Sequence, residues 1–128
     1  MPKQKTFGQT LKELRKAKQL SQRDLAAKVA KRLRDEDRRG FDFTYLSKIE
    51  NDRMGPPSAP AIIQLARELD TNSDDLLALA GRIPQDLGET LKKSEGARAF
   101  YRSAKDMNLT EEDWKKLLKD LKRRKDRK

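Results

Sequence analysis

The 128-residue sequence contains no histidine and no cysteine. Histidine or cysteine metal ligands, disulfides, thiol nucleophiles and any catalytic mechanism with a histidine base are therefore excluded. No apolar run approaches the roughly 18 residues of a membrane span, and the polar, basic first 20 residues lack the apolar core of a signal peptide. We therefore expect a cytoplasmic protein that is not an enzyme and has no membrane association, no metal and no other cofactor.

Hydrophobic and aromatic residues are also scarce, at 34% and 5% of the chain, whereas 41% of the residues are charged. A parallel sheet that is buried on both faces needs near-continuous apolar strands, which this composition cannot supply. Helices with one apolar stripe each fit the composition better. The sequence therefore predicts an all-α fold.

Positive charge dominates, with 31 Lys or Arg against 21 Asp or Glu and a formal net charge of +10. The excess lies at the two ends: residues 1–18 include six cations and one anion, and residues 114–128 include nine cations and two anions. In contrast, residues 70–89 contain five acidic residues and one Arg. Basic surfaces favour a polyanionic partner, because binding releases the counterions that condense on phosphates.

Apolar spacing and capping residues predict five short helices before residue 82. Apolar residues recur every three or four positions in five segments, namely 6–18, 22–33, 43–51, 59–69 and 74–80. Ser21, Asp42 and Ser58 precede three of these segments and are favourable N-caps. Residues 34–40 hold no apolar side chain, and we expect them to form a solvated loop. The predicted buried faces include Ala17, Leu33, Ile63 and Leu79 as well as the larger apolar residues around them.

The remaining residues, 83–128, are predicted to form a helical extension. Pro84 can open a short helix, residues 97–104 mark another, and Thr110 caps a last helix. The apolar stripe of this last helix runs from Trp114 to Leu121. Residues 122–128 are all charged, and we expect a frayed, solvated end there, with a DNA-contacting tail as the alternative.

Four blocks of the first 82 residues carry a family resemblance. They are FGQTLKELR (7–15), LSQRDLAA (20–27), FTYLSKIEN (43–51) and PSAPAIIQLAREL (57–69). In this order and with these gaps, they resemble the Xre or lambda-repressor-like helix-turn-helix family over roughly residues 7–80. The resemblance implies a five-helix helix-turn-helix DNA-binding domain over residues 1–82, followed by the helical extension.

The resemblance also implies roles for individual residues. In this family the start of the third helix enters the major groove of DNA. Base reading is therefore expected from Phe43, Thr44, Ser47 and Lys48. Phosphate binding is expected from a second group, namely Gln22, Arg23, Tyr45, Asn51 and Arg53. Arg15 and Glu50 match a structural ion pair.

Several of these positions have an alternative interpretation. Phe43 and Tyr45 could pack against the core instead, and Lys48 could reach only phosphate or water. The sequence also departs from the family pattern, because residues 30–41 separate the second and third apolar stripes where the family has a turn of a few residues. This insertion could add phosphate contacts through its arginines or could be a solvated loop whose acidic residues cancel much of its charge.

The extension holds large apolar residues that so polar a chain is not expected to leave in water. They are Phe100, Tyr101, Trp114, Leu117, Leu118 and Leu121. These residues either pair two copies of the chain or pack back on the first domain. Family members usually bind two half-sites as dimers. The leading interpretation is therefore a transcriptional repressor that binds an inverted repeat in double-stranded DNA as a homodimer.

Other interpretations use the tail for a different partner. An antitoxin-like protein would bind a toxin through its tail and autoregulate its operon. Some relatives are paired with a regulatory metallopeptidase that cleaves the repressor's tail. By this resemblance, the target of cleavage in this chain would be residues 109–121. A weaker alternative is a bridging coactivator that binds protein through the first domain.

Overall fold

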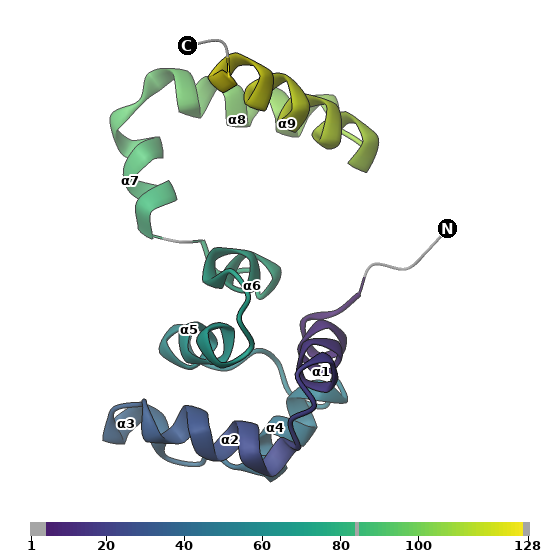
Figure 1. Ribbon diagram of the computed structural model, residues 1–128. Helices are drawn as coiled ribbons and strands as arrows, with labels where there is room; N and C mark the ends of the chain where they lie inside the picture. The colour runs from purple at the N-terminus through teal and green to yellow at the C-terminus, as the bar shows by residue number, and fades with distance from the viewer. Residues whose placement is uncertain (1–4, 84, 127–128) are drawn as a thin grey trace. The chain divides into compact units, whose positions relative to one another are not determined.

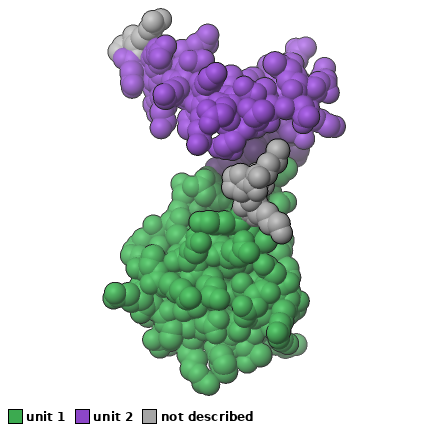
Figure 2. Space-filling model, turned by 90° about the vertical axis from the view of Figure 1, so that its right-hand side faces the viewer, with its two compact units in different colours: residues 1–84 green, residues 85–128 purple. Residues whose placement is uncertain are grey.

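The computed structural model describes residues 5–83 and 85–126, and every helix or strand assigned within these ranges is an α-helix. The chain divides into two compact units, residues 1–84 and 85–128 (Figures 1 and 2). None of the described helices is long and apolar enough to cross a membrane. The all-α fold with a helical extension is therefore confirmed.

Within residues 5–83 the first unit contains six helices: α1 (Phe7–Ala17), α2 (Gln22–Lys31), α3 (Asp35–Arg38), α4 (Phe43–Glu50), α5 (Ala59–Glu68) and α6 (Ser73–Leu79). Five of them begin with a side chain that accepts a hydrogen bond from a backbone N–H of the first turn. These caps are Thr6, Ser21, Asp42, Ser58 and Asn72. Each cap satisfies an amide that has no partner inside the helix. The polar residues between the apolar stripes thus determine where the helices start.

The apolar faces of these helices meet in one core. Helix α2 packs against α4 and α5, α1 packs against α4, and α5 packs against α6. Six of the large side chains in this core are no more than 1% exposed: Leu11, Leu25, Leu46, Ile49, Ile62 and Leu65. Removing a side chain of this size from water stabilises the fold by roughly 2 kcal/mol. The first unit therefore has its own hydrophobic core.

Gly8 allows α1 to approach the end of α4 closely. A Cβ atom at this position would overlap the carbonyl oxygen of Ile49 and would lie 2.7 Å from Oδ1 of Asp52. The hydroxyl of Thr6 donates a hydrogen bond of 2.8 Å to the same oxygen. A glycine is thus required where the start of α1 meets the residues that follow α4.

The segment between α2 and α4 differs from the prediction. Helix α2 ends at Lys31 rather than continuing through Leu33, and residues 35–38 form the single-turn helix α3 rather than an open loop. Leu33 and Phe41, on either side of this turn, are 4% and 6% exposed and belong to the core. Their burial fixes both ends of the segment, and acidic residues in the first turn of α3 favour a helical conformation.

Three residues that the sequence assigns to buried faces are exposed instead. Ala17 and Leu79 are the last residues of α1 and α6, and Ile63 follows the fully buried Ile62 in α5. The step of about 100° between consecutive helical residues turns Ile63 away from the core. Ile63 and Leu79 are each 43% exposed. Apolar residues at the edge of a stripe or in a last turn therefore lie outside the core.

The second unit consists of α7 (Gln85–Lys93), α8 (Glu95–Met107) and α9 (Glu111–Asp126). Ser94 caps α8 by accepting a hydrogen bond of 2.9 Å from the amide of Ala97. Helix α7 packs against α8. Among residues 85–126, only Ala104 is buried. These three helices therefore form no closed core among themselves.

Helix α9 starts at a reciprocal cap and continues further than predicted. The amide of Thr110 donates to Asp113 Oδ2 at 3.0 Å, and the amide of Asp113 donates to the hydroxyl oxygen of Thr110 at 3.2 Å. The hydrogen bond from the Thr110 amide, and after it the interaction of the carboxylate with the Thr110 hydroxyl, lower the pKa of the Asp113 carboxyl below its usual value of 3.8. The prediction of a frayed segment over residues 122–128 is wrong as far as Asp126, which is helical. Lys and Arg are good helix formers and favour the negative end of a helix. Residues 127–128, like Pro84, lie outside the described residues.

Candidate nucleic-acid interface

Helix α4 separates buried and exposed residues onto different faces. Leu46, Ile49 and Glu50 are at most 2% exposed and point inward. The four candidate base-reading residues occupy the outward face: Phe43 is 36% exposed, Thr44 and Lys48 are exposed, and Ser47 is half-buried. Their spacing of one, three and one residues places them together within about one and a half helical turns. The start of a capped helix with such a face has the dimensions and polarity to enter a major groove.

Glu50, at the end of α4, accepts hydrogen bonds from α1 and α2. Arg15 donates from Nε to Oε2 at 2.7 Å and from Nη2 to Oε1 at 3.0 Å, so the expected partners are in contact. Gln22 adds a hydrogen bond of 3.0 Å from Nε2 to Oε1, which the sequence does not predict. A buried carboxylate is tolerated only when its oxygens are paired. This carboxylate therefore fixes the orientation of α4 relative to α1 and α2.

Gln22 also lies at the start of α2, where phosphate binding is expected. Its side-chain amide has two hydrogens, and one of them is used by Glu50. A phosphate contact from this residue would therefore use the second hydrogen, together with the backbone N–H groups at the start of α2. The same side chain can thus contact a phosphate and hold the end of α4.

Phe43 carries an arginine on its ring instead of packing in the core. The guanidinium carbon of Arg23 lies 3.9 Å from the ring centroid. Phe43 is too exposed for the alternative in which it belongs to the core, so that alternative is wrong. A cation held over an aromatic face is restricted in its movement but keeps its charge for a phosphate. The structure thus brings together one candidate from the base-reading group and one from the phosphate-binding group.

Tyr45 packs against the core, as its alternative interpretation allows. It is half-buried, and its ring meets the edge of Phe41 at a centroid distance of 5.6 Å and an interplanar angle of 83°. Packing does not exclude a hydrogen bond from its hydroxyl to a phosphate. The aromatic pair explains why Phe41 is buried beside α4, although apolar periodicity misses this isolated residue.

The two remaining phosphate-binding candidates lie just beyond α4, and both are exposed. The side chain of Asn51 donates from Nδ2 to the carbonyl oxygen of Ser47 at 2.9 Å, which caps the end of the helix. The backbone amide of Arg53 donates to the carbonyl oxygen of Lys48 at 2.8 Å. The side chain of Asn51 thus already makes a structural hydrogen bond. The guanidinium of Arg53, in contrast, extends from a turn whose backbone is fixed.

The arginines of the insertion differ in their contacts. Arg38 donates to the carbonyl oxygen of Leu33 at 3.1 Å and lies 3.9 Å from the carboxylate of Asp35. Arg34 and Arg39 are exposed, and no ion pair is formed by either with another described residue. Of the arginines in residues 34–39, Arg34 and Arg39 are therefore the two without an ion pair among the described residues.

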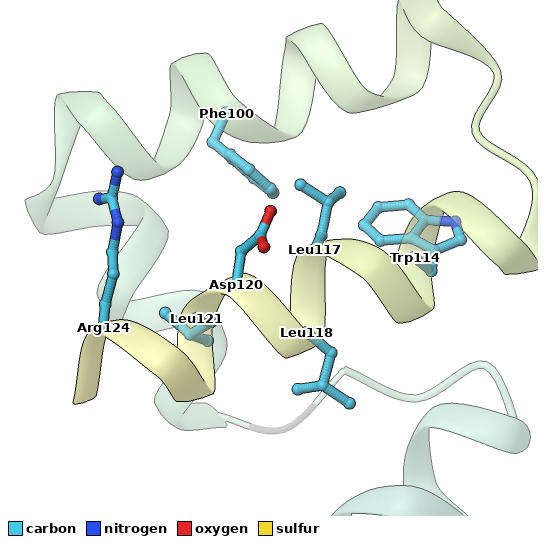
Figure 3. Close-up of a pocket in the computed structure, with 7 residues that line it drawn as sticks. All are labelled: Phe100, Trp114, Leu117, Leu118, Asp120, Leu121 and Arg124. Atoms are coloured by element: carbon cyan, nitrogen blue, oxygen red, sulfur yellow. The ribbon is translucent and has the colours of Figure 1, made fainter. Parts of the chain in front are cut away.

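Five of the six candidate dimerisation residues line an open apolar groove of about 500 Å³ (Figure 3). They are Phe100 from α8 and Trp114, Leu117, Leu118 and Leu121 from α9. Tyr101 does not line it and is 61% exposed. Leu87 and Met107, which are not among the predicted dimerisation residues, are 48% and 69% exposed and add to the apolar surface of this unit. Met107 lines a neighbouring groove of about 370 Å³.

Comparisons with known proteins identify the family of the first unit. The family model described as a helix-turn-helix domain matches residues 8–82. The chain is 35% identical over 95 residues to RghRB of Bacillus subtilis, which is named an uncharacterised HTH-type transcriptional regulator. The match includes 74% of this chain and 61% of that relative, so the chain spans about three fifths of the relative's length. No solved structure gives a significant match.

Proposed function

Because the chain belongs to the helix-turn-helix domain family, we propose that it is a sequence-specific DNA-binding transcriptional regulator whose α4 enters the major groove. The observation that carries this proposal is the outward face of α4, which displays Thr44 and Lys48 while Leu46 and Ile49 anchor the helix in the core. The name of the Bacillus subtilis relative supports the same class of function.

Two kinds of contact follow from the chemistry of the outward face. Lys48 can donate to O6 and N7 of guanine, and the methyl groups of Thr44 and thymine can touch. Arg23, Arg53 and the start of α2 would bind phosphates on either side of the groove and so position α4. The phosphate contacts make binding depend strongly on salt, whereas the base contacts discriminate between sequences.

We further propose that the regulator acts as a repressor and binds an inverted repeat as a dimer. A single helix-turn-helix reads few base pairs, and two copies double the length of the site that is read. The uncovered apolar groove of the second unit supports self-association (Figure 3). A dimer bound over a promoter would exclude the polymerase, which is the simplest route to repression.

The same groove is the observation that favours a second candidate, an antitoxin-like regulator whose tail binds a toxin or a regulatory metallopeptidase. A protein partner would cover the apolar residues of α9 in place of a second copy. Co-purification at a fixed ratio with a co-expressed small protein, from a chain that is monomeric when alone, would favour this candidate over the homodimer.

The test of the proposed function is selection of genomic DNA fragments on the purified chain at near-physiological salt, followed by sequencing. We expect an inverted repeat with half-site centres about 10 base pairs apart. Recovery of random fragments that are released by modest extra salt would contradict sequence-specific binding.

Lys48→Ala then tests the reading face with a matched control. We expect this variant to lose roughly tenfold or more in affinity for the selected site, with a much smaller loss on unrelated DNA. Lys12→Ala, which removes the same charge from α1, should affect both DNAs to a similar extent. Equal losses on both DNAs for Lys48→Ala would remove Lys48 from the base-reading residues.

A further inference from the structure

The second unit leaves most of its large apolar side chains in contact with water. Phe100 and Tyr101 of α8 are 56% and 61% exposed, and along α9 Trp114, Leu118 and Leu121 are 44%, 51% and 65% exposed. Without Tyr101, which lies outside the groove, but together with Leu117, these side chains expose on the order of 500 Å² of apolar surface per copy. The largest apolar patch of a monomeric protein is roughly 300 to 600 Å² and is often functional, and a standard interface buries about 800 Å² per partner. The surface is therefore large enough to be the centre of a stable interface.

Two opposite charges on α9 lie at equal distances from Leu118, one toward each end of the helix. Glu111 lies seven residues before Leu118, and Lys125 lies seven residues after it. Residues seven apart fall on nearly the same side of a helix, so these three residues follow one line along α9. Glu111 and Lys125 are both exposed, and neither forms an ion pair with another residue of the described chain. One end of the apolar stripe is thus acidic and the other basic.

Two α9 helices that pack side by side can run in the same direction or in opposite directions. Glu111 and Lys125 come next to opposite charges in only one of these two arrangements. If two copies of α9 pack in opposite directions about Leu118, Glu111 of each copy comes opposite Lys125 of the other, and Trp114 comes near Leu121. If they pack in the same direction, acid faces acid and base faces base, which is unfavourable. Glu111 and Lys125 therefore favour the antiparallel pair.

We infer that two copies of the chain associate through their α9 helices in an antiparallel pair, centred on Leu118 and held in register by Glu111 and Lys125. This inference rests on the proposed function, in which the regulator acts as a dimer, and it names the surface and the register of that dimer. The apolar residues supply the affinity, and the charged residues determine the direction of pairing.

The test is a charge-swapped full-length chain that carries both Glu111→Lys and Lys125→Glu. In an antiparallel pair two swapped copies regain opposite charges at both contacts, so the variant should self-associate about as tightly as the wild type. A swapped copy paired with a wild-type copy would bring like charges together at both contacts. We therefore expect tagged wild-type chain to exclude the swapped variant after the two are mixed and re-equilibrated. Glu111→Lys alone should weaken self-association about tenfold.

The matched control exchanges the same charges elsewhere on α9, in Glu112→Lys with Arg123→Glu. These two residues lie away from the apolar stripe, so this variant should mix freely with the wild type. Asp113 and Thr110 are unchanged in both variants, which preserves the cap, and far-UV circular dichroism checks that α9 is intact. Fluorescence of Trp114, the single tryptophan, should shift to shorter wavelength on association.

Three results would overturn the inference. Pairing of the swapped variant with the wild type alone would indicate a parallel pair. Free mixing of the two would mean that these charges do not set the register. A wild-type chain that stays monomeric would leave the groove to another protein. Binding of the wild-type chain to its selected DNA is measured separately. Specific DNA binding together with any of these three results would reject the antiparallel pair and leave the regulator proposal standing.

Discussion

Residues 5–83 and residues 85–126 form helices of the same kind, but the apolar faces of these helices are buried to different extents. Most helices of both regions are short and amphipathic and start at a polar cap. In the first region the apolar faces meet, and large residues on five of its helices are almost completely buried. In the second region only Ala104 is buried, although α8 and α9 each have a clear apolar stripe. Amphipathic spacing therefore predicts that a helix will bury one face, but it does not predict whether the partner is in the same chain.

The largest expected difference between the regions comes from removing the same leucine side chain in each. Leu65 is fully buried and Leu118 is 51% exposed. Leu65→Ala should destabilise the first unit by about 4 kcal/mol, because it leaves a cavity in a packed core. Leu118→Ala should leave that stability unchanged and weaken self-association. Urea unfolding followed by circular dichroism measures the first effect, and sedimentation measures the second. Equal losses of stability would mean that the second unit contributes to the same core.

Buried and exposed carboxylates provide the next comparison. Glu50 is 2% exposed and accepts three hydrogen bonds, whereas Glu89 of α7 lies 3.8 Å from an exposed Lys92. Glu50→Gln should cost about 3 kcal/mol, because it leaves the guanidinium of Arg15 buried without its counter-charge. Glu89→Gln should change the stability by less than about 0.5 kcal/mol, because water screens the exposed pair. Thermal unfolding of the two variants measures both losses of stability and so checks that the first is much larger than the second.

Two glycines should respond to alanine with opposite signs. Gly8→Ala should destabilise the first unit by about 2 kcal/mol, since α1 must move away from the carbonyl oxygen of Ile49 to admit a methyl group. At Gly88 in α7 an added Cβ meets no atom within 4 Å. Gly88→Ala should raise the helical stability of the second unit by about 0.5 to 1 kcal/mol. Unfolding of both variants in guanidinium gives the sign of each change in stability. A loss of stability in both variants would contradict the open surroundings of Gly88.

The smallest expected effect is the pH dependence of α9. The hydrogen bonds from Thr110 lower the pKa of Asp113, so the charged form stabilises the folded helix. This contribution is present above the usual pKa of 3.8 and is lost as the pH falls through the lower pKa of the folded state. Trp114 fluorescence between about pH 5 and pH 2 follows the change. Asp113→Asn should remove this part of the pH dependence, and identical profiles would show that the cap does not stabilise α9.

The sequence predicts those features of the fold that depend on neighbouring residues. Caps such as Ser21 and Asp42 and the inward positions Leu46 and Ile49 follow from spacing and side-chain chemistry, and they are present in the structure. The burial of Phe41 and the contact of Gln22 with Glu50 depend on residues that meet only after folding. Apolar periodicity along the sequence cannot predict such contacts, and it also does not predict α3.

The candidate site divides in a similar way. A resemblance of sequence blocks is enough to predict that Arg15 and Glu50 lie together, and the structure has them in contact. It does not predict the position of Arg23 over Phe43, because the two residues lie 20 positions apart and their contact depends on how α2 crosses α4. The base-reading and phosphate-binding roles stay predictions, since they concern contacts with DNA.

The separation of faces on α4 also bears on how such a protein can change over generations. The residues that anchor this helix, Leu46, Ile49 and Glu50, are different from those that face outward, such as Thr44 and Lys48. Mutations of the outward residues cost little folding stability, because surface substitutions away from structural contacts usually change it by less than about 0.5 kcal/mol. After gene duplication, two descendants could therefore acquire different DNA preferences through a few substitutions on one helix, while both inherit the same scaffold.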